Sequence, residues 1–208
     1  MKSAVPHSGY PSREEAIRIF EEKITGNPGN WVDHSRYAAF AAEQIAAAAG
    51  DMDPEKAYVL GLLHDIGRHV GIVRGRHQIE GYRFCMENGW TDCARICLTH
   101  THLLKPVNPK SAMWDISAEE VQFIADFIDQ TEYDDYDLLI QLCDSLARSI
   151  GLCVIEIRMV DVGRRYGVGP TTLKRWNRTF ELKSYFDKKC GSNIYFHLLG
   201  IGESSLLP

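Results

Sequence analysis

Almost every segment of the sequence has the apolar periodicity of an α-helix, and the alternation typical of β-strands is scarce. Local signals divide this periodicity into separate helices. Ser12 and Ser117 each begin a capping box, and Asp53 with Pro54 supplies an N-cap and a first-turn proline. Gly50 stands where a helix should end. The sequence therefore predicts an all-α fold, a single-domain bundle of about eight or nine helices.

The predicted helices are separated by short segments rich in glycine, proline or acidic residues. They span about 12–25, 30–50, 53–67, 77–88, 91–102, 117–129, 137–148 and 154–166, with a last amphipathic helix beyond residue 170. The segments 71–76 and 105–114 are predicted loops. We expect an N-terminal helix and linker over 1–29, a core over 30–150 and a helical extension over 151–208.

Composition places this chain among globular proteins. Of its 208 residues, 45% are hydrophobic and 25% are charged. No apolar run approaches the roughly 20 residues needed to cross a membrane, and the N-terminus lacks the apolar middle of a secretory signal. The six cysteines show no CxxC spacing, which favours buried thiols over disulfides or a thiolate zinc site. These features predict a cytoplasmic protein that is not bound to a membrane.

Five polar residues fall on helix faces that are otherwise apolar. They are His34, His64, His77, His100 and Asp144. A lone histidine on an apolar face is usually a core residue whose nitrogens are hydrogen-bonded. Five such positions on five predicted helices favour a shared metal ion, because a cation accepts neutral imidazole and carboxylate ligands together.

The same residues carry a resemblance to a known family. His34, the run Leu-Leu-His64-Asp65-Ile-Gly67-Arg68, and Asp144 in Leu-Ile-Gln-Leu-Cys-Asp-Ser-Leu-Ala resemble the HD-domain superfamily of metal-dependent phosphohydrolases, with a doublet of the HDIG type. The resemblance covers about residues 30–150, which makes this range the expected catalytic core. Within the superfamily, the pattern is most similar to the bacterial branch that includes symmetrical diadenosine tetraphosphate hydrolases.

The resemblance implies a set of metal ligands. His34, His64, Asp65 and Asp144 would bind one ion. His77 and His100 would bind a second ion, bridged to the first by Asp65, and His102 is an alternative to His100. Histidine and carboxylate ligands suit Fe, Mn, Ni, Co or Zn, and Mg less well.

The implied reaction is cleavage of a phosphoester or phosphoanhydride bond of a nucleotide-like substrate by a metal-bound hydroxide. His64, Asp65 and Arg68 are the implied catalytic residues. Arg68 is also a candidate phosphate ligand, with Arg74, Arg76 and Lys105 in neighbouring loops. Arg68 is equally compatible with a charge that stabilises a helix C-terminus, and Arg74, Arg76 and Lys105 are more typical of ordinary surface residues.

Positive charge is concentrated near the C-terminus. Residues 158–189 hold nine Lys or Arg and three Asp or Glu, whereas the whole chain has a net charge of −5. Residues 161–176 superficially resemble a helix-turn-helix, but the unit is short and the protein acidic, so a nucleic-acid partner is disfavoured. The positive face could instead attract an anionic substrate, or contact an acidic face of a second subunit in a homodimer.

Two other functions remain compatible with the sequence. The same ligands on this fold could hold a di-iron pair that activates oxygen, which would make the protein an oxygenase. A non-catalytic regulator would use the metal for structure and the basic segment for nucleic acid. Oxygen consumption and salt-dependent nucleic-acid binding would separate these functions from hydrolysis.

Overall fold

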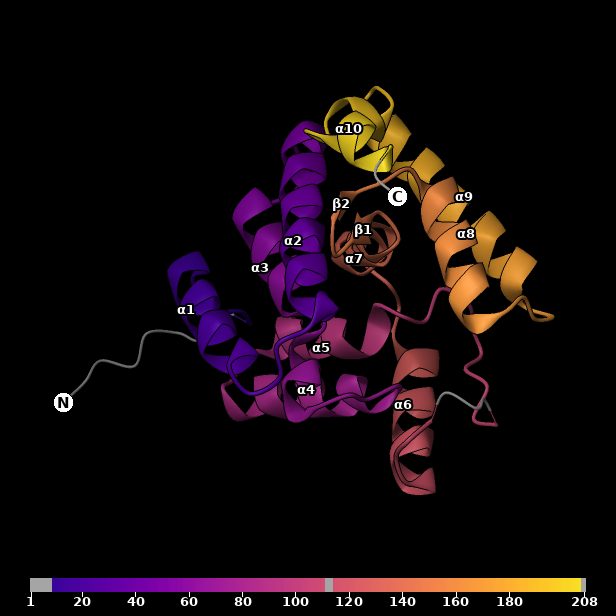
Figure 1. The fold of residues 1–208 in the computed structure, drawn as a ribbon. Helices are drawn as coiled ribbons and strands as arrows, with labels where there is room; N and C mark the ends of the chain where they lie inside the picture. The colour runs from indigo at the N-terminus through magenta and orange to yellow at the C-terminus, as the bar shows by residue number, and fades with distance from the viewer. Residues whose placement is uncertain (1–8, 111–113, 207–208) are drawn as a thin grey trace.

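The computed structural model describes residues 9–110 and 114–206, and the regular secondary structure there is almost entirely helical (Figure 1). The first helices are α1 (Arg13–Ile24), α2 (Asn30–Ala49), α3 (Pro54–Leu63), the 3₁₀ helix η1 (Ile66–Val70), α4 (Arg76–Glu87) and α5 (Thr91–Thr99). They are followed by α6 (Ala118–Gln130), α7 (Asp135–Asp144), α8 (Ile155–Tyr166), α9 (Thr172–Lys189), η2 (Ile194–Phe196) and α10 (Ile201–Ser205). A two-stranded antiparallel hairpin, β1 (Ala147–Arg148) and β2 (Gly151–Leu152), connects α7 to α8. The predicted all-α bundle is confirmed.

Side-chain caps begin several helices where the sequence places them. The Ser12 hydroxyl accepts a hydrogen bond from the Glu15 N–H at 3.2 Å, and both halves of the capping box are present between Ser117 and Glu120. Asp53 caps the first turn of α3. These bonds satisfy N–H groups that have no partner inside the helix, so the helix starts are encoded locally.

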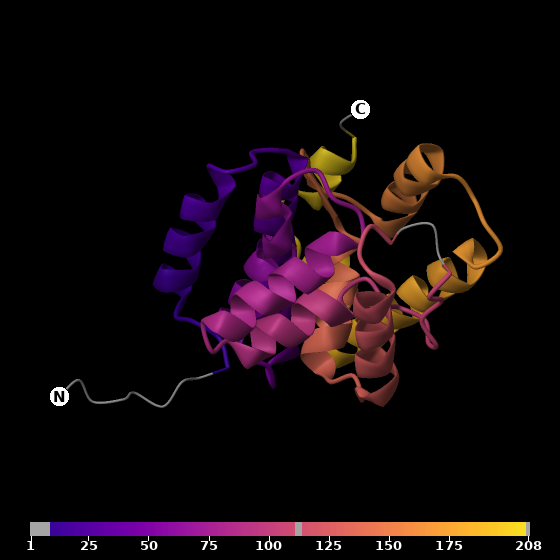
Figure 2. The ribbon, with the colours of Figure 1, turned by 90° about the horizontal axis from the view of Figure 1, so that it is seen from below.

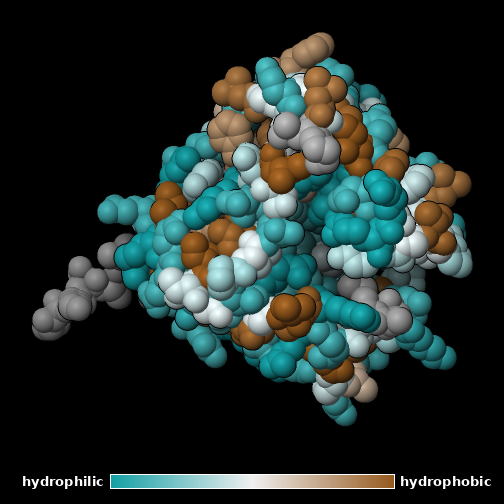
Figure 3. Space-filling view, viewed as in Figure 1, coloured by the Kyte–Doolittle hydropathy of each residue, from teal (hydrophilic) through white to brown (hydrophobic). Residues whose placement is uncertain are grey.

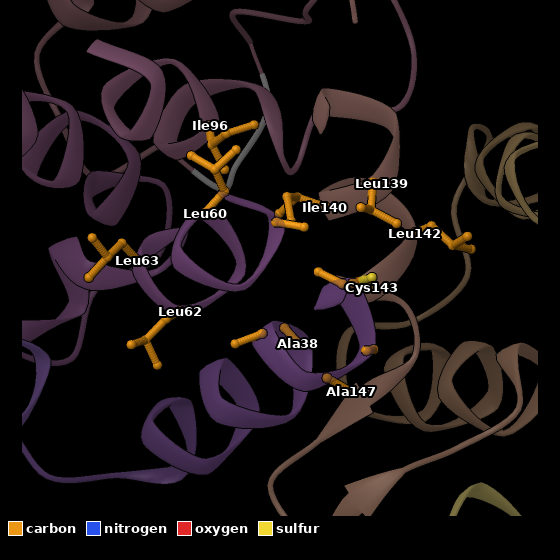
Figure 4. Close-up of a cluster of buried hydrophobic side chains, with 14 of the residues drawn as sticks. Ala38, Leu60, Leu62, Leu63, Ile96, Leu139, Ile140, Leu142, Cys143 and Ala147 are labelled. Carbon is orange, nitrogen blue, oxygen red and sulfur yellow. The ribbon is translucent and has the colours of Figure 1, made fainter. Parts of the chain in front are cut away.

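The centre of the bundle is formed by α2, α3 and α7. Leucines of α3 lie near apolar residues of α7 and near the small side chains of α2 (Figure 4). Gly61 permits this packing, since a Cβ at that position would lie 2.7 Å from Cα of Ala39. The close approach of α2 to α3 brings the middle of α2 beside the end of α3.

A second close approach places α4 against η1. A Cβ on Gly67 would lie 2.0 Å from the carbonyl oxygen of His77 and 2.5 Å from the amide nitrogen of Gly81. Only glycine fits between these backbones without a shift of one of them. Gly67 therefore allows the first turn of α4 to lie beside the turn that contains His64 and Asp65.

Three predicted helices are shorter than expected. The third ends at Leu63, the fifth at Thr99, and the seventh at Asp144 instead of Arg148. After α7 the chain reverses through the β-hairpin, where Cys153 N–H donates to the Leu146 carbonyl at 2.8 Å. Hydrogen bonds of this hairpin satisfy the backbone beyond α7, and helical periodicity does not encode them.

The C-terminal helices α8 and α9 lie on the side of the bundle opposite α1 (Figure 2). Hydrophilic side chains cover most of the face seen in Figure 3, and hydrophobic ones gather near α10, where Phe196, Leu199 and Leu206 are exposed.

Among the described residues, no helix combines the length and apolar character that crossing a membrane requires. All six cysteines are free thiols, as predicted. The predicted loop 105–114 contains no helix or strand in its described part, and residues 111–113 lie outside it.

Candidate metal centre

Side chains from five segments converge where α2, α3, α4, α5 and α7 meet. They are His34 in α2, His64 and Asp65 just after α3, His77 in the first turn of α4, His100 at the end of α5, and Asp144 at the end of α7. Two sets of three have ligand atoms within 4.8 Å of one another: His34, His64 and Asp65 form one, and Asp65, His77 and His100 form the other. Asp65 belongs to both sets. The structure thus brings together all six residues proposed as ligands from the sequence.

Asp65 is at the centre of this cluster. Its Oδ1 lies 3.3 Å from Nε2 of His77 and 3.6 Å from Nε2 of His100, and its Oδ2 lies 3.8 Å from Nε2 of His64. Oδ2 also accepts a hydrogen bond from Nε of Arg68 at 2.6 Å. The carboxylate therefore presents one oxygen to each half of the histidine cluster.

Backbone carbonyls orient all four imidazoles in the same way. In each ring Nδ1 is paired with a carbonyl oxygen: His34 with Ala147 at 3.1 Å, His64 with Gly61 at 2.7 Å, His100 with Ile96 at 3.0 Å, and His77 with Arg74. A carbonyl only accepts hydrogen bonds, so Nδ1 must carry the proton in each ring. In the neutral imidazole, Nε2 is then left with its lone pair toward the centre, which is the arrangement seen in metal-ligating histidines.

Two buried polar atoms of the cluster have no hydrogen-bond partner. They are Nε2 of His64 and Oδ1 of Asp65. Leaving such groups unpaired in the interior costs free energy, and native proteins rarely do so. Both atoms are acceptors, so they cannot satisfy each other, whereas a divalent cation would satisfy both. This observation shows that the residues present fit a metal ion.

The pKa shifts of the clustered residues favour the protonation states that bind cations. Burial lowers the pKa of His64 to about 4 and that of His77 to about 3, although Asp65 opposes both shifts. Burial would raise the pKa of Asp65, but Arg68 and the surrounding histidines hold it well below its usual range. At neutral pH these imidazoles are uncharged and the carboxylate is ionised, which are the protonation states that metal ligation needs.

His102 is held away from the cluster. Its Nε2 pairs with Oε1 of Gln78 at 2.8 Å, and its ring stacks on Trp114 with the centroids 6.1 Å apart. His102 belongs to neither set of candidate ligands, whereas His100 does. The geometry favours His100 over the alternative that the sequence left open.

The predicted phosphate-binding residues separate into two groups. Arg68 lines a cavity of about 1230 Å³ next to the cluster, beside His34, Asp65, His100 and Asp144. Arg74, Arg76 and Lys105 are not among the residues that line this cavity. Arg76 pairs with Glu80 at 3.0 Å, and Lys105 donates to the Thr131 carbonyl and lies over the ring of Tyr133. The structure thus places these three loop residues outside the lining of this cavity.

Sequence reasoning missed the residues that line the opposite wall of the cavity. This wall is formed by the β-hairpin, α8 and the first half of α9, and its charged residues include Arg148, Arg158, Arg164, Arg165 and Arg175. The local excess of positive charge over 158–189 was the available signal. The structure places much of that charge around the cavity, where the segment resembling a helix-turn-helix forms the wall.

Comparison with known proteins gives one result. A family model described as HD domain matches residues 31–149. No curated protein and no solved structure gave a match. The matched range contains all six clustered residues and ends before α8 and α9.

Proposed function

The chain belongs to the HD domain family, and from this premise we propose that it is a phosphohydrolase dependent on two divalent cations. The first would be held by His34, His64, Asp65 and Asp144, and the second by Asp65, His77 and His100. The observation that carries the proposal is the pair of buried, unpartnered acceptors, Nε2 of His64 and Oδ1 of Asp65. Imidazole and carboxylate ligands favour Fe, Mn, Ni, Co or Zn over Mg.

The chemistry of a phosphohydrolase suits such a site. Bound cations lower the pKa of water and stabilise negative charge on phosphoryl oxygens. Arg68 fixes the Asp65 carboxylate through its Nε and is itself held by the Val73 carbonyl at 3.2 Å. As a residue that also lines the cavity, Arg68 offers positive charge to a phosphoryl group bound beside Asp65.

His34 and Asp144 need a positive charge between them. Nε2 of His34 lies 3.0 Å from Oδ1 of Asp144, while Nδ1 is paired with the Ala147 carbonyl. Burial would raise the pKa of Asp144, but the hydrogen bond and charge of His34, together with Arg158 and His64, lower it. With Nδ1 carrying the proton of a neutral ring, two acceptors would face each other, so either a second proton or a metal ion must join them.

The proposed substrate is a nucleotide-like phosphate compound. Arginines that line the cavity favour an anion, and Trp31, Tyr166 and Trp176 in the same lining offer aromatic surface for a base. A cavity of about 1230 Å³ has room for a ligand larger than a simple phosphate ester.

The test combines metal analysis with a substrate screen. Native protein is analysed for bound transition metals by mass spectrometry, and phosphate or nucleotide release is followed over nucleoside mono-, di- and triphosphates and diadenosine tetraphosphate. We expect about two metal ions per chain and release that stops on chelation and returns with metal. Oxygen consumption by aerobically purified protein without any phosphate release would instead indicate an oxygenase. Metal-free protein with full hydrolytic activity would refute the proposal.

A further inference from the structure

The residues that line the cavity carry a net positive charge, whereas the whole protein is net negative. Its lining contains six arginines and four carboxylates, namely Asp65, Asp144, Glu156 and Asp161, whereas the whole chain carries −5. Two of those carboxylates belong to the candidate metal centre, so cations bound there would add further positive charge. Four of the six arginines belong to the helices α8 and α9, outside the matched HD range, and Arg148 belongs to the β-hairpin at the end of that range.

Arg175 is one of the cationic residues of these helices that form no ion pair with the described residues, and it lines the cavity. Its Nη2 donates one hydrogen bond, to the Thr101 carbonyl at 3.3 Å, and no carboxylate of the described residues forms an ion pair with it. By contrast, Arg165 pairs with Asp161 at 2.7 Å, and Arg178 pairs with Glu181 at 3.0 Å. A guanidinium has five N–H donors, so most of those on Arg175 remain available.

Arg175 is exposed to solvent and lines the cavity. The partial removal of water lowers the pKa of its guanidinium, which Asp144 partly offsets. A bound anion would supply the counter-ion that the described residues do not give Arg175.

The position of Arg175 relates it to the metal centre. The carbonyl that it contacts belongs to Thr101, the residue directly after His100. Arg158 approaches from α8: its Nη2 lies 3.9 Å from Oδ1 of Asp144 and its Nη1 lies 3.4 Å from Oδ2 of Asp161, while its buried Nε has no hydrogen-bond partner. Arg158 in α8 thus lines the cavity beside Asp144, and Arg175 in α9 lines it beside the residue that follows His100.

We infer that Arg175, together with Arg158, binds a second phosphate group of the substrate, separate from the phosphoryl group at the metal centre. This inference rests on the proposed function and narrows its substrate class to compounds with at least two phosphates, as bisphosphates or phosphoanhydrides. Guanidinium matches phosphate oxygens in a fork and keeps its charge when partly buried, whereas an ammonium group does not offer this geometry.

The test compares two ligands that differ by one phosphate. Binding of adenosine 5′-monophosphate and adenosine 3′,5′-bisphosphate to the metal-loaded full chain is measured by equilibrium dialysis at low temperature. Arg175→Ala should weaken bisphosphate binding by roughly tenfold or more, since a hydrogen-bonded charge pair is lost, and leave monophosphate binding within about twofold. Arg175→Lys should lie between Arg175→Ala and the wild type. Arg178→Ala removes the same charge from the same helix outside the cavity and should change neither affinity.

Each outcome has a defined meaning. If the wild type does not prefer the bisphosphate, if Arg175→Ala binds it as the wild type does, or if that variant loses both ligands equally, the inference is overturned. A folded Arg175→Ala protein, verified by its melting temperature, is required for the comparison, and Arg175→Lys serves if Arg175→Ala is unfolded. Selective loss of bisphosphate binding in a protein that releases no phosphate would count against the proposed function alone.

Discussion

Nε2 of His34, in the second turn of α2, lies 3.0 Å from Oδ1 of Asp144, the last residue of α7. The carbonyl of Ala147, three residues after Asp144, holds Nδ1 of the same ring at 3.1 Å. One histidine is therefore oriented by the hairpin that follows α7 while its other nitrogen faces the carboxylate that ends α7. This relationship joins the first and last residues of the candidate ligand set.

Replacing Asp65 with Asn should remove most activity while preserving the shape of the side chain. Asp65 is the residue shared by both sets of candidate ligands, so loss of its charge weakens both ions. We expect the metal content to fall below one ion per chain and kcat/KM to fall by more than about 100-fold. Asp33→Asn, on the exposed side of α2, is the matched control and should retain both properties. Unchanged metal content in Asp65→Asn would contradict the assignment.

His100 and His102 should behave differently when each is replaced by Ala. His100→Ala should lose one of the two bound ions, because Nε2 of His100 lies 3.6 Å from Oδ1 of Asp65. His102→Ala should keep both ions and lose about 1–3 kcal/mol of stability, since Gln78 loses its buried partner. Metal analysis and denaturant unfolding of the two variants decide this. Loss of an ion from His102→Ala alone would reverse the assignment.

Gly67→Ala should perturb the metal centre through the backbone. The added Cβ would lie 2.0 Å from the His77 carbonyl, so η1 or α4 must move. We expect a loss of about 3 kcal/mol in the free energy of unfolding and reduced occupancy of the ion near His77. Gly169→Ala is the control, because no atom lies within 4 Å of a Cβ built there. Equal melting temperatures for the two variants would show that the close approach is unimportant.

Acid should destabilise the metal-free protein before ordinary carboxylates titrate. Burial lowers the pKa of His64 to about 4 and of His77 to about 3, below the usual value of 6.5. The unfolded chain therefore binds more protons than the folded chain once the pH falls below about 6.5. Stability is full above that pH and falls as the pH decreases toward 4, by on the order of 2 kcal/mol for each imidazole at pH 5. Urea unfolding of chelated protein from pH 7.5 to 5 measures this. His77→Asn should give a shallower dependence, and a flat profile for the wild type would refute the prediction.

The sequence by itself determined the helices and the identity of the clustered side chains. The caps at Ser12, Asp53 and Ser117 act within one turn, and helical periodicity shows which face of a helix is buried. Caps and periodicity depend only on residues that are close in sequence, so they can be recognised without knowledge of the tertiary structure. The polar residues His34, His64 and Asp144 were identifiable because they interrupt apolar faces.

Only the tertiary structure decided which side chains from different helices meet at the site. His100 and His102 are two residues apart, and the choice between them depends on Gln78 and Trp114, which pack from other segments. The end of α7 at Asp144 depends likewise on the hairpin that follows it. Arg158 and Arg175 reach the cavity because α8 and α9 lie against the bundle, whereas the charge of the segment alone did not show where it points. Distances between helices result from the packing of all side chains together, which no local pattern contains.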